Sequence, residues 1–208
     1  MASNLFGIHG SLVAGLILVT VTAAPVTSSA SSGSGSQASA PSSETGPSYP
    51  ILPMRKGLPP KVTLDIPNRQ IDVKPVPEVN EELFRRAFAL PGVENRATIL
   101  AVPDVRGLWL NDRISLIHPE IIRRGREFAH IHVAGSLHIA LPTGRAREAV
   151  RARWAFPHLM SNQEGWEGFV LLYTPQSMEK LDSTFQLIVD AYNYITGWSV
   201  RAQDFGKK

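Results

Sequence analysis

A long stretch of low-complexity sequence, residues 27–76, confines the predicted fold to residues 77–208. Up to Ser48 it is rich in Ser, Ala and Gly. Burial there cannot offset the entropy lost on ordering, so we predict a flexible linker. The rest of the stretch is proline-rich, which predicts an extended segment lying along the domain. The 208-residue chain therefore has room for a single domain with appendages.

Residues 1–26 precede this stretch and predict a targeting segment. The apolar run Ser11–Ala24 is shorter than the roughly 20 residues that span a membrane. It suits the hydrophobic region of a signal peptide, with Ala23 and Ala24 available for cleavage. If Leu5–Ile8 join the run, a single membrane anchor results instead. We therefore expect a protein that is secreted or anchored in a membrane of the secretory pathway, through a segment that is cleaved or retained.

Composition excludes several classes of function. The absence of cysteine excludes disulfides, thiolate metal sites and a cysteine nucleophile. A net charge of +3 and the lack of nucleic-acid-binding motifs give no support to a nucleic-acid partner. The chain has no G-x-S-x-G, G-x-G-x-x-G, P-loop or H-E-x-x-H pattern, so a nicotinamide or flavin cofactor is not indicated.

Apolar periodicity and turn residues predict a single α+β domain. The predicted elements are a helix over 78–90 that ends at Pro91-Gly92, strands over 98–102, 107–110, 127–131, 137–140 and 169–173, and helices over 144–154 and from Ser177 to Gly197. Thr143 and Ser177 are the predicted N-caps of the last two helices, and Gly197 closes the final one. The order predicts a mainly antiparallel sheet with helices packed on one face.

Four histidines in this domain are the candidate catalytic residues: His130, His132, His138 and His158. The first two are two residues apart on a predicted strand, so they face the same way. A two-residue turn would put His138 on the other face of the hairpin. A three-residue loop ending at Gly135 would pair His130 with His138, and we favour it because that loop type needs a left-handed third residue.

Such a cluster suits two kinds of chemistry. Imidazoles titrate near neutral pH and act as general bases and acids, and with no cofactor motif in the chain the first expectation is a site without a cofactor. Alternatively, His130, His132 and His138 bind a divalent metal ion. Glu127, three residues before His130, is expected to face away from the cluster if the strand is regular, and an ion pair or cap is the simplest role for it and for Arg126.

Other side chains are candidates for substrate binding or for the core. Trp154, Phe156, Trp166 and Tyr173 can wall a pocket for a flat ligand, although Trp154 and Tyr173 also suit the core. Arginines crowd the predicted helix 144–154 and predict a solvated face, with an anion site as the alternative. They are Arg145, Arg147, Arg151 and Arg153.

The order of these motifs resembles the luciferase domain of bioluminescent fungi, which many non-luminous proteins share. The resemblance is best over residues 126–197. It rests on Arg126-Glu127-Phe128-Ala129-His130-Ile131-His132, Ser136-Leu137-His138-Ile139-Ala140-Leu141, Trp154 with His158, and Leu171-Leu172-Tyr173-Thr174-Pro175. The resemblance implies a membrane-associated enzyme that adds O2 to a hydroxylated styryl-pyrone without an organic cofactor. The matching positions are the four histidines, Trp154 and Tyr173, and the substrate-binding set adds Arg126 and Glu127.

Three functions follow as hypotheses. The first is an oxygen-using or acid/base enzyme that acts on a small aromatic or polyketide-type metabolite, with a histidine removing a proton. The second is a histidine metal site, either catalytic or structural. The third is an exported small-molecule-binding domain without catalysis.

Overall fold

The structure is a computed structural model that describes residues 48–99 and 103–206. The predicted targeting segment, nearly all of the predicted linker and the end of the predicted strand 98–102 lie outside the described residues. Within the described part of the chain, no helix combines the length and apolar character needed to cross a membrane.

The main sheet has six strands in the order β3-β4-β5-β6-β8-β7, and every neighbouring pair is antiparallel. Its strands are β3 (Val93–Ala97), β4 (Arg106–Leu110), β5 (Glu127–Ile131), β6 (Leu137–Ala140), β7 (Ala155–Pro157) and β8 (Phe169–Leu172). A separate two-stranded sheet pairs β1 (Lys61–Val62) with β2 (Gln70–Ile71). The helices are α1 (Pro77–Phe88), α2 (Thr143–Arg151) and α3 (Met178–Thr196), with 3-10 turns η1 (Pro119–Ile121) and η2 (Ala202–Phe205).

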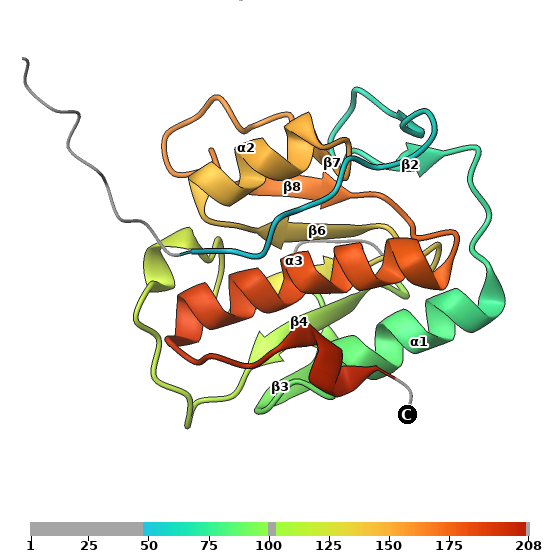
Figure 1. The fold of residues 1–208 in the computed structure, drawn as a ribbon. Helices are drawn as coiled ribbons and strands as arrows, with labels where there is room; N and C mark the ends of the chain where they lie inside the picture. Colours follow the sequence, from blue (N-terminus) through green and yellow to red (C-terminus); the bar gives the residue numbers. More distant parts are fainter. Residues whose placement is uncertain (1–47, 100–102, 207–208) are drawn as a thin grey trace, which may run out of the picture. The chain divides into compact units, whose positions relative to one another are not determined.

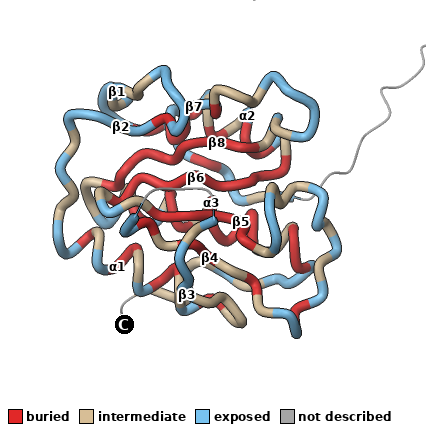
Figure 2. The backbone as a smooth tube through the Cα atoms, turned by 180° about the vertical axis from the view of Figure 1, so that it is seen from behind, coloured by how far each residue is buried: buried red, intermediate tan, exposed pale blue. Residues whose placement is uncertain are grey.

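Helices α1, α2 and α3 lie in front of the sheet in Figure 1, so the predicted α+β class with helices on one face is confirmed for the described residues. Seen from behind in Figure 2, β6 and β8 are buried along their length. Side chains alternate across each strand, so one face of β6 meets the helices and the other carries His138. Leu137 and Ile139 belong to the helix-facing core.

Helix α3 supplies much of the core and matches its prediction. The Ser177 hydroxyl accepts a hydrogen bond from the Lys180 amide at 3.3 Å. At the other end, Gly197 takes a left-handed conformation with φ 73°. The apolar residues at helical spacing, Leu181, Phe185, Ile188, Tyr192 and Ile195, are all fully buried. Cap and apolar stripe are local signals, which is why the sequence predicts this helix well.

Three predicted features differ from the structure. The strand predicted over 98–102 lies earlier, at Val93–Ala97, because the chain enters the sheet directly after the turn at Gly92. Thr143 lies inside α2, whose N-cap is Pro142 and makes no side-chain cap bond. Helix α2 ends at Arg151 because Arg153 adopts φ 65°, and the short edge strand β7 follows.

The extended segment before α1 packs directly onto the domain. Leu52 joins the hydrophobic core. The Arg55 amide donates to the Ala152 carbonyl at 2.9 Å, and the Trp154 indole donates to the Pro53 carbonyl at 2.6 Å. Residues 52–55 thus lie along the domain, and Leu52 helps to bury its core.

Candidate functional site

The hairpin β5–β6 has the predicted three-residue loop. His130 is the register partner of His138. The His132 amide donates to the Ser136 carbonyl at 2.8 Å, and Gly135 has the required positive φ, 81°. The prediction is confirmed, and three imidazoles share the face of the sheet opposite the helices.

His138 is the centre of the histidine cluster, which we define as His130, His132, His138 and His158. Ring centroids lie 5.1 Å from His138 for His130, 5.0 Å for His132 and 5.3 Å for His158. His158 comes from the turn after β7 and reaches the same face, because β7 pairs with β8 beside β6. His130, His138 and His158 are buried and His132 is half-buried.

Glu127 faces this cluster, because β5 is not the regular strand on which the expectation that it faces away depends. The ladder between β4 and β5 shifts register: Ala129 lies opposite Leu108, but Glu127 lies opposite Trp109. This bulge leaves Phe128 without a partner and turns its ring toward the helices, where it contacts Tyr192. The extra residue returns Glu127 to the face that carries the histidines.

The Glu127 carboxylate is buried and begins a chain of close polar contacts through two imidazoles. Its Oε1 lies 3.2 Å from His130 Nδ1. His130 Nε2 lies 3.1 Å from His138 Nδ1, and His138 Nε2 lies 2.9 Å from Asn68 Oδ1. The carboxylate is itself held by the Thr98 hydroxyl at 2.5 Å and the Ile99 amide at 3.0 Å. The chain fixes the orientation of both rings.

His132 and His158 lie beside this chain with contacts of their own. His132 Nδ1 lies 2.9 Å from the Ser136 hydroxyl oxygen. His158 Nδ1 accepts a hydrogen bond from the Met160 amide at 3.2 Å, so a neutral His158 carries its proton on Nε2. When His132 donates from Nδ1 to the Ser136 hydroxyl, its Nε2 carries a lone pair, whereas a neutral His158 donates from Nε2.

Burial sets the charge state of three of these rings. It lowers the pKa of His132 to about 4, with smaller contributions from the charges of His130 and Arg69. Burial, followed by His130, His132 and His158, lowers the pKa of His138 well below its usual value. Burial and His130 also lower the pKa of His158. A neutral imidazole has a lone pair, which both proton removal and metal binding require.

Aromatic rings border the cluster, but only some of them belong to the set that the sequence predicts as a pocket wall. Trp166 stacks on His158 with centroids 5.5 Å apart, and Phe169 stacks on His138 at 5.7 Å. Tyr173 instead lies under the Arg55 guanidinium. Trp154 holds the Pro53 carbonyl and belongs to the core. In the described part of the chain, neither Trp154 nor Tyr173 has a hydrogen bond or ring contact with a cluster histidine.

Arg126 contacts the end of β4 and the turn that follows it rather than the histidine cluster. Its guanidinium donates to the carbonyls of Leu110 and Asn111, each at 2.8 Å. Asn68 and Ser136 were not predicted as part of the site. Ser136 lies next to a predicted strand, but Asn68 is 70 residues from its partner, so no local pattern indicates it.

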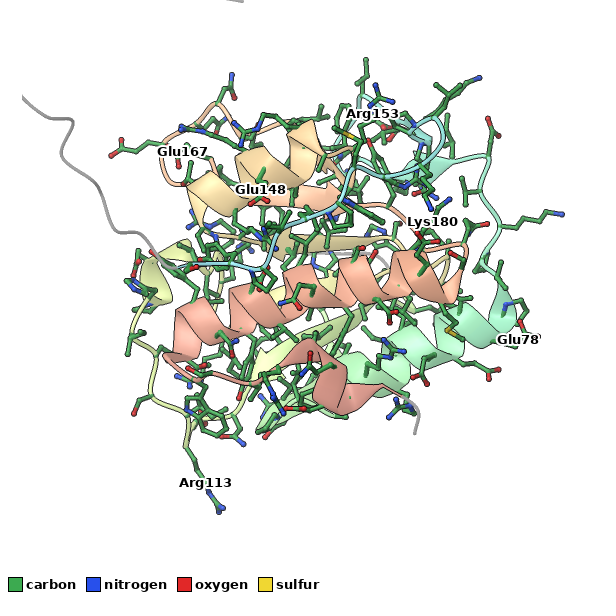
Figure 3. The ribbon with its side chains drawn as sticks, viewed as in Figure 1. Glu78, Arg113, Glu148, Arg153, Glu167 and Lys180 are labelled. Carbon is green, nitrogen blue, oxygen red and sulfur yellow. The ribbon has the colours of Figure 1, made fainter. Side chains whose placement is uncertain are left out.

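The arginines of α2 are not all solvated. Arg147, Arg151 and Arg153 are exposed, and Figure 3 shows Arg153 extending outward. Arg145 is buried, which corrects the prediction for this residue, and it pairs with Asp190 at 2.7 Å. Asp190 also lines a cavity of about 590 Å³ on the helix side of the sheet, away from the histidine cluster.

The cluster can hold a metal ion. One ring nitrogen from each of His130, His132 and His138 lies within 4.8 Å of the other two. Three convergent imidazoles, with a carboxylate behind one of them, form the ligand pattern of a zinc-type site. The structure thus supports the alternative of a divalent ion as well as acid–base chemistry.

Fold and site together define a class: an α+β domain with a histidine cluster on the face of its sheet opposite the helices. The family model for the luciferase domain matches residues 125–191, about a third of the chain, and all four cluster histidines lie in that segment. The expected resemblance to the luciferase-domain family is thus confirmed over this segment. Searches of curated proteins and of solved structures found no significant match.

Proposed function

We propose that this protein is an enzyme that removes a proton from a small aromatic or polyketide-type metabolite at the histidine cluster and adds O2 to the resulting anion. The observation that carries the proposal is the buried chain from Glu127 through His130 to His138, with two further imidazoles beside it. A sheet face that had only to be buried would be filled by apolar side chains.

The geometry suggests a role for each ring. His132 Nε2 accepts the proton from an enol, phenol or acidic C–H, because its Nδ1 is already engaged by Ser136. The Nε2–H of His158 donates a hydrogen bond to the negative oxygen that forms. His130 and His138 act as positioning residues, because the chain from Glu127 to Asn68 occupies both nitrogens of each.

The oxygen step balances without an external reductant. Removal of the proton leaves an electron pair delocalised between carbon and oxygen. The carbon end supplies this pair to O2, a C–O bond forms, and the terminal oxygen becomes a peroxide anion. The proton held on His132 then yields the hydroperoxide. Trp166 and Phe169 supply flat apolar surfaces beside the cluster, which suits an aromatic substrate and limits access of water.

Two assays separate the two steps. The protein is incubated with a hydroxylated styryl-pyrone, a simple hydroxy-2-pyrone and a phenol. Under argon in D2O, NMR measures exchange at the acidic C–H. Under air, an electrode measures O2 uptake. His132→Ala is expected to slow exchange by about 10²-fold or more. His118→Ala is the matched control, because His118 stacks on Tyr194 at 3.9 Å outside the cluster.

Binding of these compounds without exchange or O2 uptake would reject the enzyme in favour of a binding domain. Exchange without O2 uptake would support the proposed proton removal and reject the proposed addition of O2. Equal rates in the wild type and His132→Ala would show that proton removal occurs elsewhere.

We also propose that residues 1–26 direct the protein into the secretory pathway, as a cleaved signal or as an anchor. The apolar run Ser11–Ala24 supports this proposal. N-terminal sequencing of the secreted and membrane fractions tests it. A start after Ala24 indicates cleavage, a start at Met1 in membranes indicates an anchor, and a cytosolic protein with an intact N-terminus contradicts both.

A further inference from the structure

Three of the cluster histidines each have one ring nitrogen within hydrogen-bond distance of an oxygen atom outside the cluster. His130 Nδ1 faces the Glu127 carboxylate, His138 Nε2 faces Asn68 Oδ1, and His132 Nδ1 faces the Ser136 hydroxyl. This is the arrangement of metal-binding histidines, whose second nitrogen donates to a carboxylate, carbonyl or other oxygen that fixes the ring. All three rings follow it, although their oxygen partners come from three different segments.

When both rings donate outward, the inward nitrogens of His130 and His138 favour a cation between them. If His130 and His138 donate outward, the facing atoms His130 Nε2 and His138 Nδ1 both carry lone pairs, and they lie 3.1 Å apart. Two lone pairs at this distance repel each other unless a proton or a metal ion lies between them. In a tetrahedral site with metal–nitrogen bonds of about 2.0–2.1 Å, ligand nitrogens lie about 3.3 Å apart. The observed separation is close to that value.

We infer that His130 Nε2, His138 Nδ1 and His132 Nε2 bind one divalent first-row transition-metal ion and leave its fourth position open. The presence of the ion does not depend on the proposed function; only its role rests on it. Imidazole nitrogens suit Zn²⁺ and its neighbours. Three protein ligands with an open position are the arrangement of catalytic rather than structural zinc sites.

The site needs a small adjustment to close. One ring nitrogen from each of the three histidines lies within 4.8 Å of the other two, so the widest pair of these nitrogens must shorten by at most about 1.5 Å to reach tetrahedral spacing. His132 is the half-buried member of the three and lies next to the hairpin loop, so we expect its ring to make this adjustment. Glu127 offers a negative charge behind His130, whereas the nearby charge of Arg69 opposes a cation.

His158 completes the arrangement without joining the ligands. Its Nδ1 accepts the Met160 amide hydrogen, so its Nε2 carries a proton and cannot bind a metal. It remains a hydrogen-bond donor beside the open position. An enol or phenol oxygen bound there would lose its proton more readily, because the ion stabilises the oxyanion. In the loaded protein His132 would be a ligand rather than the base, and the proton of the enol or phenol would pass to solvent water.

The test uses the full chain stripped with a chelator and then titrated with Co²⁺, whose visible absorption reports tetrahedral coordination. We expect one Co²⁺ per chain by equilibrium dialysis, with displacement by Zn²⁺. His132→Ala should weaken binding at least 100-fold, and Asn68→Ala, which removes the carboxamide that contacts His138 Nε2, by about 10- to 100-fold. His118→Ala should bind as the wild type does. Near-UV circular dichroism verifies that each variant is folded.

Absence of Co²⁺ and Zn²⁺ binding to the folded wild type overturns the inference. Binding that His132→Ala leaves unchanged also overturns it. The proposed function fails separately: full Co²⁺ occupancy without C–H exchange in D2O rejects proton removal and keeps the metal site. Exchange in a protein that binds neither ion rejects only the metal site.

Discussion

Replacement of Glu127 by glutamine tests the buried chain with the smallest change of shape. The carboxylate accepts three hydrogen bonds, from the Thr98 hydroxyl, the Ile99 amide and, when Nδ1 is protonated, His130. In Glu127→Gln the amide oxygen can still accept the hydrogen bond from the Ile99 amide. The Thr98 hydroxyl can rotate to accept a hydrogen bond from the new NH2 group. Only the contact with His130 cannot be kept as it is, because two N–H groups would then face each other.

The expected cost is therefore the loss of one charge-assisted hydrogen bond, about 1.5–3 kcal/mol. For a domain of this size each kcal/mol shifts Tm by about 2–4 °C, so Tm should fall by about 3–12 °C. The variant can recover part of this loss if the His130 proton moves from Nδ1 to Nε2. Nitrogen-15 NMR of the imidazoles detects this change of tautomer, and the moved proton should also reduce Co²⁺ affinity.

Glu164→Gln is the matched control, because Glu164 is exposed and should change stability by less than about 0.5 kcal/mol. If Glu127→Gln is as stable as this control and the His130 tautomer is unchanged, the carboxylate does not anchor the imidazole chain. The roles assigned to His130 and His138 would then lose their basis.

Two further predictions concern the scaffold. Gly135→Ala should lower the free energy of unfolding, measured by chemical denaturation, by about 1–2 kcal/mol, because φ is 81° and the new Cβ would lie 2.5 Å from Asn80 Oδ1. Gly144→Ala is the control, because its Cβ meets open space inside α2 and the change should be neutral or stabilising. Hydrogen bonds from Arg85, and then from Arg86, lower the pKa of Glu82 to about 2 against an unfolded value near 4.5. The contribution of Glu82 to stability is thus present above about pH 5 and is lost as pH falls toward 2. The free energy of unfolding of Glu82→Gln should therefore approach that of the wild type at low pH. A difference between the two that stays constant with pH would contradict the assignment.

Local patterns predict the parts of the site that depend on neighbours in sequence. Strand alternation and the glycine at position 135 are enough to place His130 and His138 opposite each other. The cap at Ser177 and the glycine at Gly197 likewise predict both ends of α3. In each case the deciding interaction spans only a few residues, so the sequence carries the information directly.

The features that sequence patterns miss depend on distant partners. The bulge that turns Glu127 toward the histidines arises from pairing with β4, where Trp109 lies opposite Glu127. A strand read by itself is regular, which is why Glu127 was expected on the other face. Asn68 reaches His138 from a hairpin 70 residues earlier. Arg145 is expected to be exposed, as arginines on a helix surface usually are. Asp190 on α3 lies beside it and pairs with it inside the protein.

The division between matched and unmatched sequence suggests where specificity resides. The luciferase-domain match covers residues 125–191 and includes the four histidines, Trp166 and Phe169. Asn68, Arg69 and Thr98 approach the cluster from outside this segment. The imidazole chemistry can therefore remain the same while the earlier loops adapt to different substrates. Arg69 makes this idea testable, because its exposed charge acts on His132.

Arg69→Gln should have opposite effects on the two ligands proposed for the site. An anionic metabolite loses an attractive charge, so its KM should rise by up to about fivefold, with less effect at high salt. A divalent cation loses a repulsive charge, so Co²⁺ should bind more tightly by a similar factor. Lys61→Gln, on the same hairpin and exposed, is the control. If both affinities change in the same direction, Arg69 acts through the structure of the loop rather than through its charge, and the electrostatic argument fails.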